Sequence, residues 1–123
     1  MARLQESSLE RVESFGDQVI RVSEALESAA VSRRIVDQLV GSGTSVGANI
    51  FEADEAMSRA DFVECLAVAA KELSETRYWL RLCSRHDWVP AHKLGLLLGE
   101  VAELRKIVGT MITRTKKKPA IKS

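Results

Sequence analysis

Residues 58–85 read SRADFVECLAVAAKELSETRYWLRLCSR, and this stretch decides the fold. Its apolar and small side chains recur at alternating steps of four and three residues, which is the spacing of one buried stripe along an α-helix. Ser58 followed by Asp61 is typical of a helix N-terminus, because the serine oxygen can accept a hydrogen bond from a free backbone N–H group. The stripe therefore predicts one long helix, and it consists of Phe62, Leu66, Ala69, Leu73, Thr76, Leu80 and Cys83.

The same alternation of steps appears in two other segments of the chain, residues 12–29 and 94–111. No segment shows the period of two that a half-buried strand would require. The connection around residues 85–89 is short, and a short connection makes consecutive helices antiparallel neighbours. The sequence therefore predicts an all-α fold, an up-and-down antiparallel four-helix bundle over residues 1–115, followed by a basic C-terminal tail at residues 116–123.

The remaining predicted helix contains a glycine-rich run, GSGTSVGAN, at residues 41–49. By local composition the run resembles a loop, because each interior glycine costs a helix about 1 kcal/mol relative to alanine. However, the apolar stripe that Ile35 and Leu39 begin resumes in phase at Val46 and Ile50. The phase favours a helix whose small residues let a neighbouring helix approach closely, with a loop as the alternative.

Basic and acidic residues are unevenly distributed, although the net charge of the 123 residues is only +1. Residues 1–62 carry six basic and eleven acidic side chains, whereas residues 63–123 carry twelve basic and six acidic ones. A basic patch can attract phosphate groups, so RNA or DNA is a candidate partner. A solvated tail is the alternative, because no aromatic residue interleaves the basic run. The candidate nucleic-acid contacts are Arg105, Lys106, Arg114, Lys116, Lys117, Lys118 and Lys122.

The sequence gives no indication of a membrane segment or a secretory signal. Charged side chains interrupt the apolar residues throughout the first twenty positions. The longest apolar runs reach six residues, far below the roughly 20 that span a bilayer. We therefore expect a cytoplasmic protein without a membrane partner.

The chain has few of the residue patterns that bind metals or cofactors, or catalyse reactions, in helical proteins. The two histidines, His86 and His92, lack the Glu-x-x-His spacing of a di-iron bundle. The glycine-rich run matches neither a dinucleotide-binding fingerprint nor a phosphate-binding loop. Cys65 and Cys83 are 18 residues apart on one helix, too far for a disulfide, and are expected as reduced thiols. We therefore expect no catalytic, cofactor-binding or metal-binding residue, and no enzyme.

Three polar residues share one face of the helix that contains the glycine-rich run. Ser45, Asn49 and Glu52 stand at positions i, i+4 and i+7, beside the apolar stripe. A buried polar group without a hydrogen-bond partner costs about 1–3 kcal/mol, so these side chains need partners on the next helix. We predict a polar network that fixes helix register, with a ligand- or partner-facing site as the alternative. Its residues are Ser45, Asn49, Glu52, Glu75 and Tyr78.

The helix predicted over residues 58–85 also carries apolar side chains outside its main stripe. A lone bundle needs one buried face per helix, so the surplus indicates a contact between chains. Tryptophan is enriched in such contacts, although core filling is the alternative for it. We predict a homo-oligomer whose subunit interface includes Val63, Trp79 and Leu82.

Two stretches of the chain resemble a known family. SVGANIFEA at residues 45–53 resembles the pattern Ser-Ile/Val-x-x-Asn-Ile-x-Glu-Gly, with Ala53 in place of the glycine, and residues 58–80 resemble the helix that follows it. Over residues 9–115 the chain is similar to the four-helix-bundle proteins encoded in 23S ribosomal RNA intervening sequences. The resemblance implies a bundle without catalytic residues that is often a homopentamer. A related branch resembles the accessory proteins of diversity-generating retroelements, which bind a reverse transcriptase and nucleic acid.

These observations favour a non-enzymatic, self-assembling bundle that binds a partner. The expected partner is nucleic acid or a nucleic-acid enzyme such as a reverse transcriptase. A structural or regulatory protein–protein module without affinity for nucleic acid is the alternative.

Overall fold

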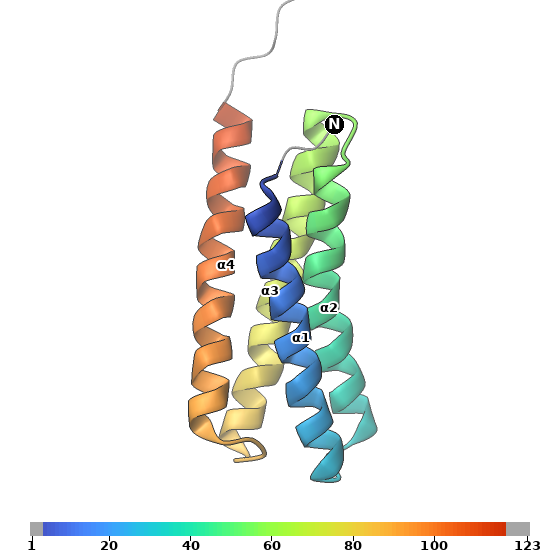
Figure 1. Cartoon of the computed structure of the whole chain (residues 1–123), viewed down its shortest axis with the longest axis vertical. Coiled ribbons are helices and arrows are strands. Elements are labelled where there is room, and N and C mark those ends of the chain that lie inside the picture. Colours follow the sequence, from blue (N-terminus) through green and yellow to red (C-terminus); the bar gives the residue numbers. More distant parts are fainter. Residues whose placement is uncertain (1–3, 118–123) are drawn as a thin grey trace, which may run out of the picture.

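The structure is a computed structural model that describes residues 4–117. Four α-helices stand side by side, and each runs antiparallel to the one before it (Figure 1). The described residues contain no strand. The all-α, up-and-down four-helix bundle predicted from the sequence is therefore confirmed. The helices are α1 (Glu6–Ser28), α2 (Arg33–Asp54), α3 (Arg59–Arg85) and α4 (Ala91–Lys117).

The glycine-rich run is helical throughout, as the phase of its apolar stripe predicts. Gly43 is buried, and a Cβ atom built on it would lie 2.5 Å from Cγ1 of Val19 on α1. A Cβ on Gly41 would meet nothing within 4 Å. The glycine at position 43 therefore permits the close approach of α1 and α2, whereas the glycine at position 41 has no such role in this chain.

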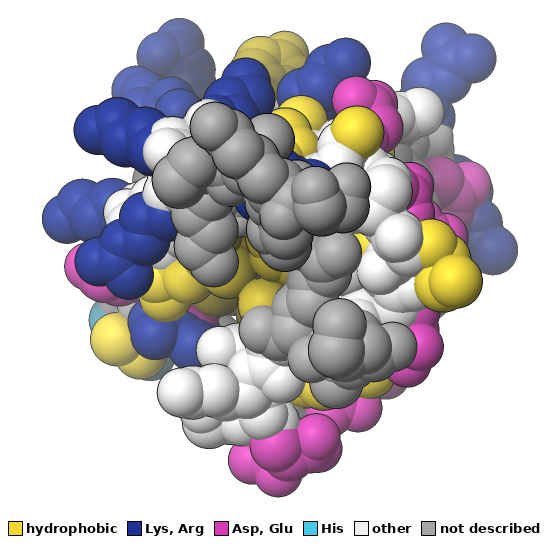
Figure 2. Space-filling model, turned by 90° about the horizontal axis from the view of Figure 1, so that it is seen from above, with side chains coloured by type: hydrophobic (Ala, Val, Ile, Leu, Met, Phe, Trp, Pro, Cys, Tyr) yellow, Lys and Arg dark blue, Asp and Glu magenta, His cyan; other side chains and the backbone are white. Residues whose placement is uncertain are grey.

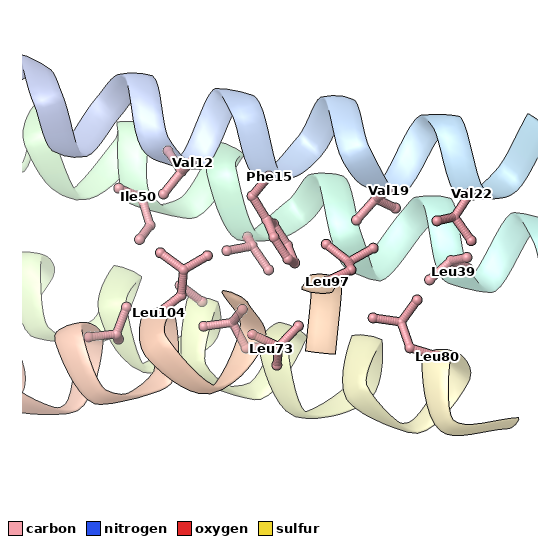
Figure 3. Close-up of a cluster of buried hydrophobic side chains, with 14 of the residues drawn as sticks. Val12, Phe15, Val19, Val22, Leu39, Ile50, Leu73, Leu80, Leu97 and Leu104 are labelled. Carbon is pink, nitrogen blue, oxygen red and sulfur yellow. The ribbon is translucent and has the colours of Figure 1, made fainter. Parts of the chain in front are cut away.

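One apolar core runs along the bundle and receives side chains from all four helices (Figure 3). Phe15 of α1, Leu39 of α2 and Leu73 of α3 are completely buried, and Leu104 of α4 is nearly so. Every position of the predicted α3 stripe is buried, including the polar Thr76. The alternating spacing in the sequence therefore identifies the core face of α3 without error.

The turns after α1 and α3 share one geometry, and neither contains glycine. Ala30 and Asp87 have positive φ values of 58° and 53°. In each turn the next N–H group donates to a carbonyl five residues earlier, as Trp88 does to Cys83 at 3.2 Å. This arrangement satisfies the free carbonyl groups at the helix end and reverses the chain within a few residues. It therefore places α1 beside α2, and α3 beside α4, as antiparallel neighbours.

The seam between α1 and α4 is the most open side of the bundle. α4 packs along α3 but makes only slight contact with α1. A groove of about 190 Å³ lies between them, lined by apolar side chains that include Val12 and Met111. Arg11 also lines this groove. It donates to Glu100 from Nε at 2.8 Å and from Nη2 at 2.7 Å, and this hydrogen bonding raises the pKa of Arg11. A bidentate ion pair thus connects α1 to α4, two helices that have few other contacts with each other.

The basic C-terminal region begins on the helix rather than after it. α4 continues through Lys117, so Lys116 and Lys117 are helical, although the sequence pattern assigns them to the tail. Lys118 and Lys122 lie outside the described residues.

We expect Gly43→Ala to lower the free energy of unfolding by about 1–3 kcal/mol. The new methyl group would lie 2.5 and 2.8 Å from the two Cγ atoms of Val19 and 3.1 Å from its Cβ atom. A Cβ atom is bonded directly to the backbone, so Val19 cannot move away without a shift of α1. Urea denaturation followed by circular dichroism, at one fixed protein concentration, measures the change.

Gly41→Ala is the matched control on the same helix. It should raise stability by up to about 1 kcal/mol, because alanine favours the helix and the position has open space. Equal stability of the two variants would contradict the role assigned to Gly43. Val19→Ala introduced together with Gly43→Ala should cost less than the sum of the two single changes, because it removes the overlap.

Candidate functional site

Opposite charges predominate on α1 and α4, two neighbouring helices of the bundle. α1 carries six acidic and two basic side chains, whereas α4 carries six basic and two acidic ones. Viewed from the end where α4 finishes, Lys and Arg lie mainly along the side of α4, and Asp and Glu mainly on the other sides (Figure 2). The net charge of the chain is low although its positive and negative side chains are unevenly distributed. The positive face is a surface on which an anionic partner could bind.

Four of the five predicted basic contacts on α4 line one shallow hollow of about 540 Å³, and Lys116 lies outside it. Arg105, Lys106, Arg114 and Lys117 surround Gly109 there, and all four charged side chains are exposed. Only one of them has an ion pair in the described chain, a long contact of 3.9 Å between Lys106 and Glu103. Most of the positive charge on this hollow is therefore available to a partner.

A second basic hollow lies on α3, where the sequence analysis predicts other contacts for Tyr78 and Leu82 but no contact with nucleic acid. It has a volume of about 380 Å³ and is lined by Ser74, Arg77, Tyr78, Arg81, Leu82 and Arg85. The three arginines stand at positions i, i+4 and i+8, so they form a ladder on one exposed side of the helix. That spacing is visible in the sequence, but it is less conspicuous than the continuous basic run at the C-terminus.

The predicted polar network between α2 and α3 is not formed in the described chain. Ser45 donates to the carbonyl of Gly41 at 2.6 Å, and Asn49 donates to the carbonyl of Ser45 at 2.8 Å. Both hydrogen bonds lie within α2, and Glu52 is exposed. Ser45 and Asn49 are therefore satisfied by their own helix, a possibility that spacing alone does not distinguish from an interhelical contact.

The other two members of the predicted network lie on the outer side of α3. Glu75 accepts a hydrogen bond from Nε1 of Trp79 at 3.1 Å. Tyr78 is 58% exposed and meets Trp79 edge-on, with ring centroids 4.9 Å apart. The structure thus brings Glu75, Tyr78 and Trp79 together as a surface cluster and separates them from Ser45 and Asn49.

The buried polar contact between α2 and α3 involves a different pair. Thr76 donates to Ser42 at 3.0 Å between the hydroxyl oxygens, and both residues are buried. Thr76 Oγ1 also lies 2.8 Å from the carbonyl oxygen of Glu72, and Ser42 Oγ lies 3.3 Å from that of Leu39. The sequence pattern does not reveal this pair, because threonine and serine occupy positions where the spacing predicts core side chains.

The sequence profile of the 23S rRNA-intervening sequence protein family matches residues 8–110. The match extends from the beginning of α1 to near the end of α4 and includes most of the chain. The chain belongs to the 23S rRNA-intervening sequence protein family. A search of curated proteins found no match.

A solved structure supports the same assignment for this member of the family. It is a protein of unknown function from the S23 ribosomal protein family of Bacteroides thetaiotaomicron, 32% identical in sequence, with a TM-score of 0.81. The similarity covers 85% of the present chain and 96% of the other. Arg77, Arg81 and Arg85 lie within the residues matched by the family profile, whereas Arg114 and Lys117 lie beyond them.

The predicted interface residues of this family member do not form one patch. Val63, Trp79 and Leu82 are all partly buried in the single chain. Trp79 and Leu82 are one turn apart, but Val63 stands 19 residues before Leu82, about 28 Å along the helix. The most exposed large apolar side chain on a helix is instead Leu96 of α4, at 75%.

Titratable and metal-binding groups form no cluster within residues 4–117 that could hold a metal ion. Cys65 and Cys83 are both free thiols. Burial raises the pKa of the Cys83 thiol to about 11, and burial together with nearby carboxylates raises that of Cys65. His86 stacks on Trp88 with ring centroids 4.6 Å apart. No helix in this part of the chain is long and apolar enough to cross a membrane.

The hydrogen bond between Ser42 and Thr76 should appear as a coupling energy in a double-mutant cycle. We expect Ser42→Ala and Thr76→Val each to lower the free energy of unfolding by about 1 kcal/mol. The double variant should cost less than the sum by about 0.5–1.5 kcal/mol, because the second change no longer breaks an intact bond. Urea unfolding of the four proteins gives the cycle.

Thr115→Val is the matched control for this cycle. Thr115 Oγ1 lies 2.7 Å from the carbonyl oxygen of Met111, an internal contact like that between Thr76 and Glu72, but it has no bond to Ser42. Its effect should therefore add to that of Ser42→Ala. Additive behaviour of Thr76→Val as well would mean that the interhelical bond does not contribute to stability.

Proposed function

We propose that this chain is a non-enzymatic, self-assembling helical bundle that binds nucleic acid through the face formed by α3 and α4. The observation that carries the proposal is the separation of charge between α1 and α4, which gives a nearly neutral chain a strongly basic side (Figure 2). Phosphate groups are attracted to such a surface without any requirement for sequence. Membership of the 23S rRNA-intervening sequence protein family agrees with this function but does not specify a partner.

Self-assembly would multiply the effect of each basic face. In a symmetric homo-oligomer the hollow on α4 would be repeated around the axis, so that several modest patches would act on one nucleic-acid strand. The exposed Leu96 supports a contact between chains, because a large apolar side chain gains free energy when it is covered. The family resemblance suggests five as the subunit number to test.

A protein–protein module is the second candidate function. Leu96 and the exposed Phe51 would then contact a protein partner, which includes the case of a nucleic-acid enzyme such as a reverse transcriptase. The two functions differ in their dependence on salt. Binding to phosphate weakens steeply as salt rises, whereas an apolar contact does not.

We expect the full chain to sediment as an oligomer at micromolar concentration. Leu96→Gln should shift the distribution toward smaller species without changing the circular dichroism spectrum, because the side chain is exposed in the single chain. Sedimentation velocity measures the distribution of species. A monomer at every concentration would contradict self-assembly, and an unchanged oligomer would place Leu96 outside the interface.

We expect the full chain to bind labelled RNA and DNA oligonucleotides, and to release them as salt rises from 50 to 200 mM. Arg105→Gln with Lys106→Gln should make the plot of log affinity against log salt shallower, in the case of single strands by about 0.7 for each phosphate that is no longer neutralised. Fluorescence anisotropy gives the affinities.

The matched control removes the same charge from the other side of the bundle. Arg21→Gln with Arg34→Gln changes two exposed arginines on α1 and α2, neither of which has an ion pair within residues 4–117. This double variant should bind nucleic acid nearly as the full chain does. Negligible binding by the full chain at 50 mM salt would favour the protein–protein module instead.

A further inference from the structure

The hollow on α3 combines three arginines with an exposed aromatic ring. Successive arginines at positions 77, 81 and 85 are separated by about 6 Å along the helix axis. All three side chains are exposed, and none has an ion pair within residues 4–117. Tyr78 lines the same hollow, with 58% of its surface exposed. An aromatic residue thus lies among the basic residues of the α3 hollow, whereas the basic hollow on α4 is lined by none.

Contacts behind the ring hold Tyr78 in place. Its ring meets that of Trp79 at an interplanar angle of 73°, with centroids 4.9 Å apart. Trp79 in turn is packed against the apolar core and donates from Nε1 to Glu75. Because these contacts restrict the tyrosine before any ligand arrives, less conformational entropy is lost when a flat group stacks on its free surface.

We propose that the α3 hollow is a binding site for single-stranded nucleic acid, in which an unpaired base stacks on Tyr78 and neighbouring phosphates contact Arg77, Arg81 and Arg85. Stacking requires a base that is free of its neighbours, and a duplex does not present one. The arginines follow the backbone of the strand and read no sequence. This inference rests on the proposed function and deepens it in two ways. It specifies that the bound nucleic acid is single-stranded, and it adds a second contact surface on α3.

The site predicts a preference that the α4 hollow alone would not give. A groove lined only by lysine and arginine neutralises phosphates on either form of nucleic acid, whereas an aromatic platform selects unpaired bases. We therefore expect the full chain to bind oligo(dT) and oligo(rU) more tightly than a DNA duplex of equal length at about 100 mM salt. Comparison of the two oligonucleotides determines whether the sugar contributes.

The decisive variants change the ring and the ladder separately. Tyr78→Ala should weaken single-strand binding by roughly 5- to 140-fold, whereas Tyr78→Phe should retain it, because phenylalanine also stacks. Arg77→Gln with Arg81→Gln should make the salt dependence shallower by about 1.4, the value for two phosphate contacts on a single strand. Arg21→Gln with Arg34→Gln is the control of equal charge change. Circular dichroism and sedimentation of each variant establish that fold and assembly are retained.

The outcomes separate this inference from the proposed function. Unchanged single-strand binding by Tyr78→Ala and by the arginine variant, together with weaker binding by Arg105→Gln with Lys106→Gln, would overturn the α3 site and leave the proposed function in place. Equal affinity for single strands and duplex would also overturn it. Absence of any nucleic-acid binding would overturn both. Binding of an acidic peptide such as oligoglutamate, with no binding of oligonucleotides, would assign the ladder to a protein partner.

Discussion

The close approach of α1 and α2 at Gly43 is the constraint on which the arrangement of the helices depends. Val19 occupies the space where any larger residue would place its Cβ atom, so the two helix backbones can come together only at a glycine. The neighbouring Ser42 points toward α3, where its hydroxyl receives the hydrogen bond from Thr76. Two consecutive residues of α2 therefore fix its position relative to both flanking helices, one by lacking a side chain and one by a buried polar contact.

α4 is held in a different way, and this difference determines which surface is open. It is connected to α3 by a turn of a few residues and shares the apolar core, but it has only slight contact with α1. Arg11 and Glu100 connect the two helices with charges opposite to those that dominate on each helix. Arg105, Lys106, Arg114 and Lys117 are exposed, so the outer side of α4 is strongly positive.

The fold could be predicted from the sequence because the core of each helix depends on spacing alone. The stripe from Phe62 to Cys83 shows which side of α3 is buried, because its apolar and small side chains recur at helical spacing. The phase of the stripe across the glycine-rich run also identifies α2 as continuous. The sites could not be predicted equally well, because hydrogen bonds depend on direction as well as on helical face. Ser45 and Asn49 share a face that could have pointed to α3, yet they bond to carbonyl groups one turn earlier.

The same distinction explains why the aromatic platform could not be predicted. In the sequence Tyr78 stands next to Trp79 and three residues after Glu75, so spacing alone assigns all three to contacts with other helices or other chains. The structure shows that they contact one another on the outside of α3, where Glu75 fixes Trp79 and Trp79 supports Tyr78. The Glu75 carboxylate accepts the indole hydrogen bond and keeps its negative charge, which the three arginines of the hollow outnumber. Glu75 holds Trp79, and Trp79 supports the Tyr78 ring beside the three arginines. An acidic residue thus helps to position the aromatic ring of a basic surface.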